Sequence, residues 1–187
     1  MNASAPAPSP SGDQPLDAFA QCHVGILSHL QAFGQLPALL EPAARARRIA
    51  ADTLAFFREA VIEHHAEEEN ELFAGVLASA NAGAERKQVG EIVERLTREH
   101  RQIESRWRKL EPELKKVAKG QDSAIDPAAI TSLVEAYEAH ARYEEASFLP
   151  LSQTILGRNG DHMAALGLSL HLRHAMPEVL ARFGGRI

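Results

Sequence analysis

The chain has 187 residues, of which 45% are hydrophobic and 24% charged, and its formal net charge is −5. This length and balance predict a soluble globular protein with a single main domain. No dense basic segment accompanies the negative charge, so we do not expect nucleic acid as a partner.

Cysteine usage and hydropathy exclude further classes. The single cysteine, Cys22, excludes an internal disulfide and any metal site built from several cysteines. No run of about 18 apolar residues occurs, so we expect no membrane span. The first residues lack the basic start and apolar core of a secretion signal. These features predict a cytoplasmic protein with no membrane partner.

Five helical segments are predicted in chain order, and strand patterns are absent. Residues 1–15 are rich in Pro, Ser and Ala and are predicted to be a disordered tail. A first helix is expected from Leu16 to about Gly34, and a second from about Ala43 to Ser79, where Asn81-Ala82-Gly83 should end it. The predicted domain, residues 16–152, continues with two more helices, and a short helical extension covers residues 153–187.

The third and fourth helices have the clearest boundaries. Apolar residues at helical spacing run from Val89 to Val117, although Pro112 should kink this helix or end it early. Asp126-Pro127 is typical of an N-cap followed by proline at the first helical position. Four helices joined by short breaks predict an all-α, antiparallel up-down four-helix bundle.

Each of these four helices carries a histidine within its apolar stripe. In the second and fourth helices a glutamate follows one turn later, so each His-x-x-x-Glu pair shares a helix face. A buried charge without a partner is costly, and a cation between such groups removes that cost. The candidate metal ligands are His23, His64, Glu68, His100, His140 and Glu144.

A weak internal repeat supports this choice of ligands. His-x-x-x-Glu-Glu begins at both His64 and His140, which leaves His65 in the shifted register. Glu104, one turn after His100, is a candidate further ligand or a hydrogen-bond partner of one. The acidic residues beside His65 are interpreted as a solvated face, with the alternative that one of them orients a ligand histidine; they are Glu67, Glu69 and Glu71.

The histidine and glutamate set suits iron, zinc or manganese, and carboxylates can bridge two ions. His171 and His174 have ligand-like spacing but no nearby carboxylate, so we assign them surface or packing roles. Ferritin-like proteins use Glu-x-x-His pairs, and no histidine in this chain has a glutamate three residues before it.

At these residues the sequence resembles the hemerythrin-like, or HHE cation-binding, family over about residues 16–152. The resemblance implies a four-helix bundle with a non-haem di-iron centre that binds oxygen, nitric oxide or related small ligands. Oxygen carriers of this family have a second histidine where this chain has Glu104, and a carboxylate where it has Glu145. Glu144 instead follows the shorter spacing of the HHE branch. The resemblance thus implies a more carboxylate-rich shell, which favours ferric iron and argues against reversible oxygen carriage.

Three functions remain open from the sequence. The first, which we favour, is a di-iron binding protein that senses or sequesters oxygen, nitric oxide, peroxide or iron. The second is a di-iron oxidase or peroxidase, which would need an open coordination position. The third is a zinc-stabilised structural bundle without redox chemistry. The sequence identifies no protein partner and no oligomeric state.

Overall fold

The computed structural model describes the backbone of residues 14–158 and the side chains of residues 21–158. Every regular element in that part of the chain is a helix, and no strand occurs there. The predicted all-α class is therefore confirmed for the described residues. The chain divides between Arg45 and Ala46 into two compact units.

The first unit contains α1 (Gln14–Gly34) and the start of α2 (Leu36–Phe56). Only Gln35 separates the two helices, so α2 begins earlier than the predicted start near Ala43. Pro37 occupies the second position of α2, where the missing N–H is of no consequence because it has no partner within the helix. Several large apolar side chains of α1 are exposed, among them Ile26, Leu30 and Phe33.

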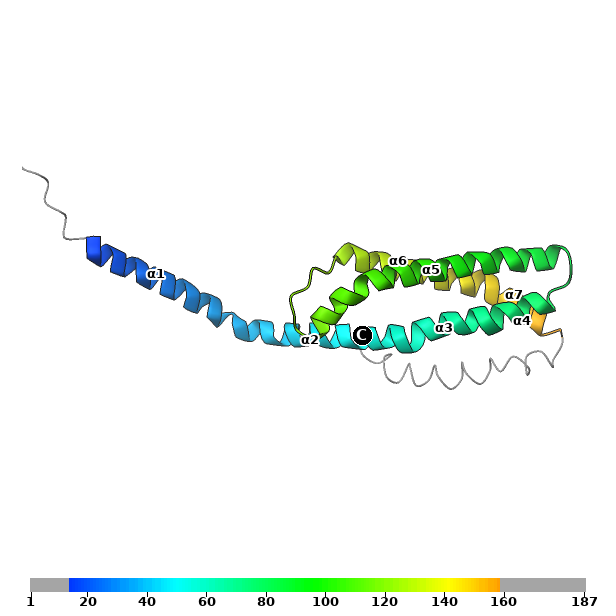
Figure 1. Ribbon diagram of the computed structural model, residues 1–187, viewed down its shortest axis with the longest axis horizontal. Helices are drawn as coiled ribbons and strands as arrows, with labels where there is room; N and C mark the ends of the chain where they lie inside the picture. Colours follow the sequence, from blue (N-terminus) through cyan, green and yellow to red (C-terminus); the bar gives the residue numbers. More distant parts are fainter. Residues whose placement is uncertain (1–13, 159–187) are drawn as a thin grey trace, which may run out of the picture. The chain divides into compact units, whose positions relative to one another are not determined.

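The second unit is built from three rods, each of which is one or more helices in continuous sequence. The first rod continues α2 through a π turn, η1 (Phe57–Val61), then α3 (Ile62–Glu67), a second π turn, η2 (Glu68–Leu72), and α4 (Phe73–Ser79). The second rod is α5 (Ala84–Ala118). The third comprises α6 (Pro127–Tyr143), a π turn, η3 (Glu144–Phe148), and α7 (Leu149–Leu156). Figure 1 shows these rods side by side.

Both predicted breaks between the rods are confirmed. The first rod ends at Ser79, and Gly83 precedes α5 with a φ of 95°, a conformation that glycine adopts without a steric penalty. The carboxylate of Asp126 accepts a hydrogen bond of 2.9 Å from the backbone N–H of Ala128. With Pro127 at the first helical position, this is the N-cap that the sequence predicts for α6.

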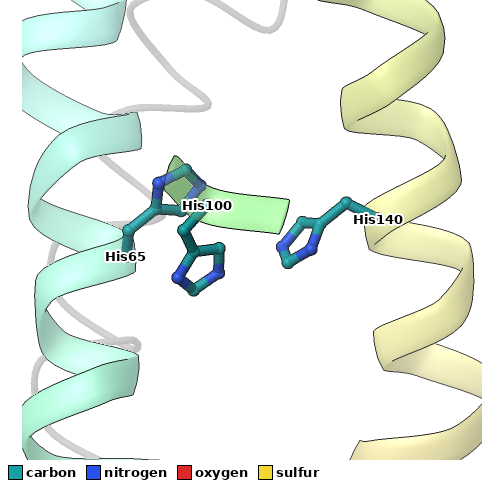
Figure 2. A group of neighbouring side chains, drawn as sticks. All are labelled: His65, His100 and His140. Atoms are coloured by element: carbon teal, nitrogen blue, oxygen red, sulfur yellow. The ribbon is translucent and has the colours of Figure 1, made fainter. Parts of the chain in front are cut away.

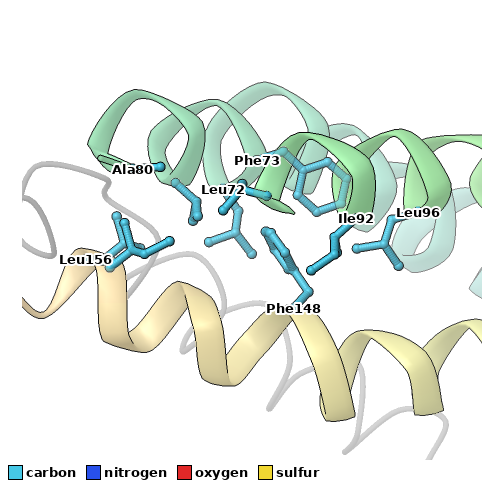
Figure 3. Packing of buried hydrophobic residues seen from close by; sticks show 10 residues of the cluster. Leu72, Phe73, Ala80, Ile92, Leu96, Phe148 and Leu156 are labelled. Carbon is cyan, nitrogen blue, oxygen red and sulfur yellow. The ribbon is translucent and has the colours of Figure 1, made fainter. Parts of the chain in front are cut away.

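Two apolar clusters hold the rods together. One surrounds Phe73 and Phe148, whose rings meet edge to face at 4.9 Å (Figure 3). The other contains Phe57 and Trp107, whose rings stack at 3.9 Å. Between these clusters, the same inward faces carry buried histidines and glutamates instead of apolar residues.

The two prolines within the later helices do not end them. Of the two outcomes expected at Pro112, a kink or an early end of the helix, the early end is wrong, because α5 continues to Ala118. The carbonyl that loses its donor belongs to Arg108, an exposed residue, where water can replace the missing bond. Pro150 lies in the first turn of α7, which carries the third rod to Leu156. Of the predicted C-terminal extension, residues 153–187, the part from residue 159 on, with His171 and His174, lies outside the described residues.

Candidate metal centre

Three buried imidazoles, one from each rod, converge between the apolar clusters. His65 of α3, His100 of α5 and His140 of α6 are 1%, 0% and 2% exposed. Figure 2 shows the three rings directed into the space between the rods. The rings of His65 and His100 stack at 3.9 Å, and each residue offers a nitrogen within 4.8 Å of the others. Nitrogen ligands at this separation can share one ion.

A second group lies beside the first and is richer in oxygen. It consists of His64, Glu68 and Glu144. One oxygen of Glu68, Oε1, lies 3.0 Å from Nε2 of His64, and the other, Oε2, lies 3.2 Å from Nε2 of His100. Glu68 therefore faces both groups with different oxygens, which is the arrangement of a bridging carboxylate.

The two buried glutamates occupy equivalent places in their rods. Glu68 is the first residue of the π turn η2, and Glu144 is the first residue of the π turn η3. A π turn holds one residue more than an α turn and occurs often at functional sites. The internal repeat seen in the sequence thus corresponds to a repeated departure from regular α-helix.

Each of the three imidazoles meets a carboxylate at its Nδ1 atom. The distances are 3.4 Å from His65 to Glu104, 2.8 Å from His100 to Glu69, and 3.2 Å from His140 to Glu99. A carboxylate accepts the Nδ1 proton, so in the neutral ring the lone pair belongs to Nε2. This is the pairing that fixes the ring orientation of histidines that bind metals.

Four buried polar atoms in the cluster have no hydrogen-bond partner: Nε2 of His65, His100 and His140, and Oε2 of Glu68. His100 Nε2 and Glu68 Oε2 lie 3.2 Å apart without a hydrogen bond, because both are acceptors when Nδ1 holds the proton. Each such atom costs about 1–3 kcal/mol when left unsatisfied. A cation between them is the group that satisfies all four, so the residues present fit a metal ion.

Burial keeps the imidazoles of His65 and His140 in the neutral form that binds metal. Burial lowers the pKa of His65 to about 3, and it also lowers the pKa of His140. Both imidazoles are therefore neutral near pH 7, as metal ligation requires. For Glu68, burial alone would raise the pKa, but the neighbouring imidazoles of His100 and His64 lower it well below its usual value.

Glu144 behaves in the opposite way to Glu68. Burial, followed by the negative charge of Glu68, raises the pKa of Glu144 to about 8. Two neighbouring buried carboxyl groups cannot both ionise at low cost, so the pair retains a proton near pH 7. His64, which is half-buried, has a raised pKa because it hydrogen-bonds to Glu68.

The structure brings together five of the six sequence-predicted ligands, namely His64, Glu68, His100, His140 and Glu144. His23 lies on α1, in the first unit, and the groups described here belong to the second unit alone. Glu104 is a hydrogen-bond partner of His65.

His65 is the residue that the sequence reasoning missed. The repeat assigned it to the shifted register, yet it is more deeply buried than His64. Two steps of 3.6 residues from Phe57 reach about position 64, so regular helical periodicity favours His64 and gives no signal for His65. Glu69 belongs to the acidic cluster that we interpreted as solvated, with a histidine-orienting member as the alternative. No pattern in the sequence indicated Glu99.

A cavity of about 350 Å³ borders the second group. Its walls include His64, Glu68, His140 and Glu144, together with the ring of Tyr137. Three apolar residues and two further glutamates complete the lining, namely Leu72, Ala141, Leu149, Glu67 and Glu145. The cavity therefore places a small ligand beside the carboxylates.

An all-α fold with a buried cluster of imidazoles and carboxylates defines a metal-binding helical protein. Comparison with family models matches residues 14–152 to the hemerythrin HHE cation binding domain. The chain belongs to this family. Comparisons with curated proteins and with solved structures gave no match. Within the described residues, no helix is both long and apolar enough to cross a membrane.

Proposed function

We propose that the chain holds a non-haem di-iron centre and uses it to bind or sense oxygen, nitric oxide, peroxide or iron itself. The observation that carries this proposal is the set of four buried atoms that lack hydrogen-bond partners. The candidate ligands form two different groups. One group offers three imidazole nitrogens, and the other offers an imidazole and two carboxylates. A bound iron pair would supply redox chemistry and open coordination positions for a small ligand.

The two-ion arrangement is supported by Glu68. Because its two oxygens face imidazoles of different groups, one carboxylate can hold both ions. Glu144 would add a second oxygen ligand from the opposite rod once it loses its proton. The mixed nitrogen and oxygen donors suit iron, and they also accommodate manganese or zinc.

We further propose that α1 completes an antiparallel up-down four-helix bundle and contributes His23 as a ligand. The pairing of Phe57 with Trp107, and of His65 with His100, supports opposite directions for the first two rods. The family match begins at residue 14, so it includes α1.

The chain's own residues would control which ligands reach the centre. The cavity beside Glu68 and Glu144 has room for a small ligand. Buried side chains exclude bulk water from the three imidazoles, and Tyr137 forms part of the cavity wall. A diatomic gas or peroxide is therefore the expected partner.

Iron quantification and ultraviolet–visible spectra test the proposal. Purified aerobically, the protein should contain close to two iron atoms per chain and show visible absorption. Dithionite should bleach this absorption, and oxygen or nitric oxide should then change the spectrum. Zinc at the same stoichiometry, with no visible absorption, would favour a structural role instead. Rapid turnover of peroxide or nitric oxide would favour the enzyme.

A further inference from the structure

The three carboxylates at the histidine Nδ1 atoms are themselves held by arginines. The side chains of Glu69, Glu99 and Glu104 are 19%, 22% and 18% exposed, so they lie between the buried rings and the surface. A carboxylate at this depth can rotate toward water unless a second partner holds it. In each case that partner is a guanidinium group.

Arg101 holds two of these carboxylates at once. Its Nη1 atom donates to Glu104 Oε1 at 3.1 Å, and its Nη2 atom donates to Glu69 Oε2. Glu69 belongs to the first rod and Glu104 to α5, so one planar group joins carboxylates from two rods. The fixed fork of a guanidinium suits this task because its donors point in set directions.

The path from Arg101 into the cluster is continuous. Glu69 uses Oε2 for Arg101 and Oε1 for His100 Nδ1. Glu104 turns Oε1 toward both Arg101 and His65 Nδ1. The two rings at the end of this path are the ones that stack on each other at 3.9 Å. A shift of either carboxylate would therefore release a ring that the other ring packs against.

His140 is served by a separate arginine. Arg95 donates to Glu99 at 2.8 Å, and its guanidinium lies 3.4 Å above the ring of Tyr143. Glu99 then meets His140 Nδ1 at 3.2 Å. Two of the three imidazoles thus depend on Arg101, and the third depends on Arg95.

We propose that Arg101 is a positioning residue for the metal site, fixing Glu69 and Glu104 and, through them, the rings of His100 and His65. The inference rests on metal binding by these histidines, as set out in the proposed function. Loss of groups that orient ligand histidines lowers metal affinity about 10–100-fold. Arg101 itself touches no ligand atom, and its side chain is 55% exposed, so its replacement should leave the fold intact.

The test is a titration of the purified, metal-free full chain with Co²⁺ alone, followed by visible absorption, which reports affinity and ligand geometry together. Arg101→Gln should weaken binding at least tenfold and change the absorption bands, in line with the effect of orienting groups. Arg142→Gln is the matched control, because Arg142 forms an exposed pair with Glu138 at 3.6 Å and contacts no carboxylate of the cluster. It should bind as the wild type does.

Two further variants separate positioning from a simple effect of charge. Arg101→Lys keeps the charge but loses the fork, so it should remain clearly weaker than the wild type. Combining Arg101→Gln with Glu69→Gln should cost less than the sum of the two single changes, because both act on His100 through one path. Full recovery in the lysine variant, or strict additivity, would overturn the inference.

The outcomes also distinguish this inference from the proposed function. A wild-type chain that takes up no Co²⁺ would contradict metal binding by the histidines, and the positioning role would fail with it. Wild-type binding that Arg101→Gln leaves unchanged would overturn the positioning role alone.

Discussion

Replacing His65 with leucine tests whether the buried imidazoles exist for a metal. An ordinary core histidine is fully hydrogen-bonded, and its loss destabilises the protein. His65 is 1% exposed, but its Nε2 atom has no partner. Leucine has a similar size and no polar atom, so it removes that unsatisfied group.

The expected energies nearly cancel in the metal-free protein. Leucine removes the cost of the unpartnered nitrogen, about 1–3 kcal/mol. Against this, the change loses the ring stack on His100, about 0.5–1.5 kcal/mol. It also loses the 3.4 Å contact with Glu104, which at that length is worth about 1 kcal/mol. Glu104 retains Arg101, so it is not left without a partner. We expect a net change within about 1 kcal/mol.

With metal present, the loss of stability caused by His65→Leu should be large. A ligand at about 1,000 times its dissociation constant stabilises the folded state by about 4 kcal/mol. The leucine variant should lose most of that stabilisation, because it lacks one of three imidazoles in its group.

Chemical unfolding measures the free energy of unfolding without and with metal. The transition can be followed through Trp107, the single tryptophan, which is buried against Phe57. Titrations in EDTA and in anaerobic Fe²⁺ should be compared for the wild type and His65→Leu. Leu96→Ala is the control, since it opens a cavity at a fully buried site and should cost about 2–5 kcal/mol in both conditions. A loss above about 3 kcal/mol for His65→Leu in EDTA, as for an ordinary core residue, would refute the reasoning.

Three other outcomes are expected. His140→Ala should lose most bound iron, whereas His171→Ala should retain it; equal iron contents by elemental analysis would contradict the ligand assignment. Because the pKa of Glu144 is raised to about 8, metal must displace its proton, so Fe²⁺ affinity should increase by up to about tenfold per pH unit up to pH 8. Glu135→Gln, at an exposed position of α6, should leave this slope intact, and a flat profile in the wild type would contradict the raised pKa of Glu144. In EDTA the stability of the protein depends on pH in the opposite direction. The folded state binds an extra proton on Glu144 between the unfolded pKa of 4.5 and the folded pKa of about 8. Stability should therefore fall as pH rises from 6.5 to 8, by up to about 1.4 kcal/mol per unit, and Glu144→Gln should flatten this decline in unfolding titrations.

Much of the second unit could be predicted from helical periodicity and end signals. The stripe from Val89 to Leu110 is buried in α5, and Asp126 caps α6 as expected. These features are local, because a cap depends on a few neighbouring residues and a stripe depends on a constant step along one helix.

The repeat selected His64 and left out His65, although the structure places both in the cluster. It pairs His64 with His140, so His65 aligns with Ala141 and receives no signal from the repeat. Glu99 was missed for another reason. Its role depends on His140 from another rod, and a contact between distant residues leaves no pattern along the chain.

The π turn η2 also gives the first rod one residue more than a plain α-helix would hold over the same turn. Excising one residue within Glu68–Leu72 would therefore restore plain α geometry without rotating the helix beyond it. Phe73 and Val76, now almost wholly enclosed, would keep their inward faces, whereas the residues within the turn would lose their present directions. A shortened chain would keep its far end packed but would no longer present Glu68 to a cation as it does now.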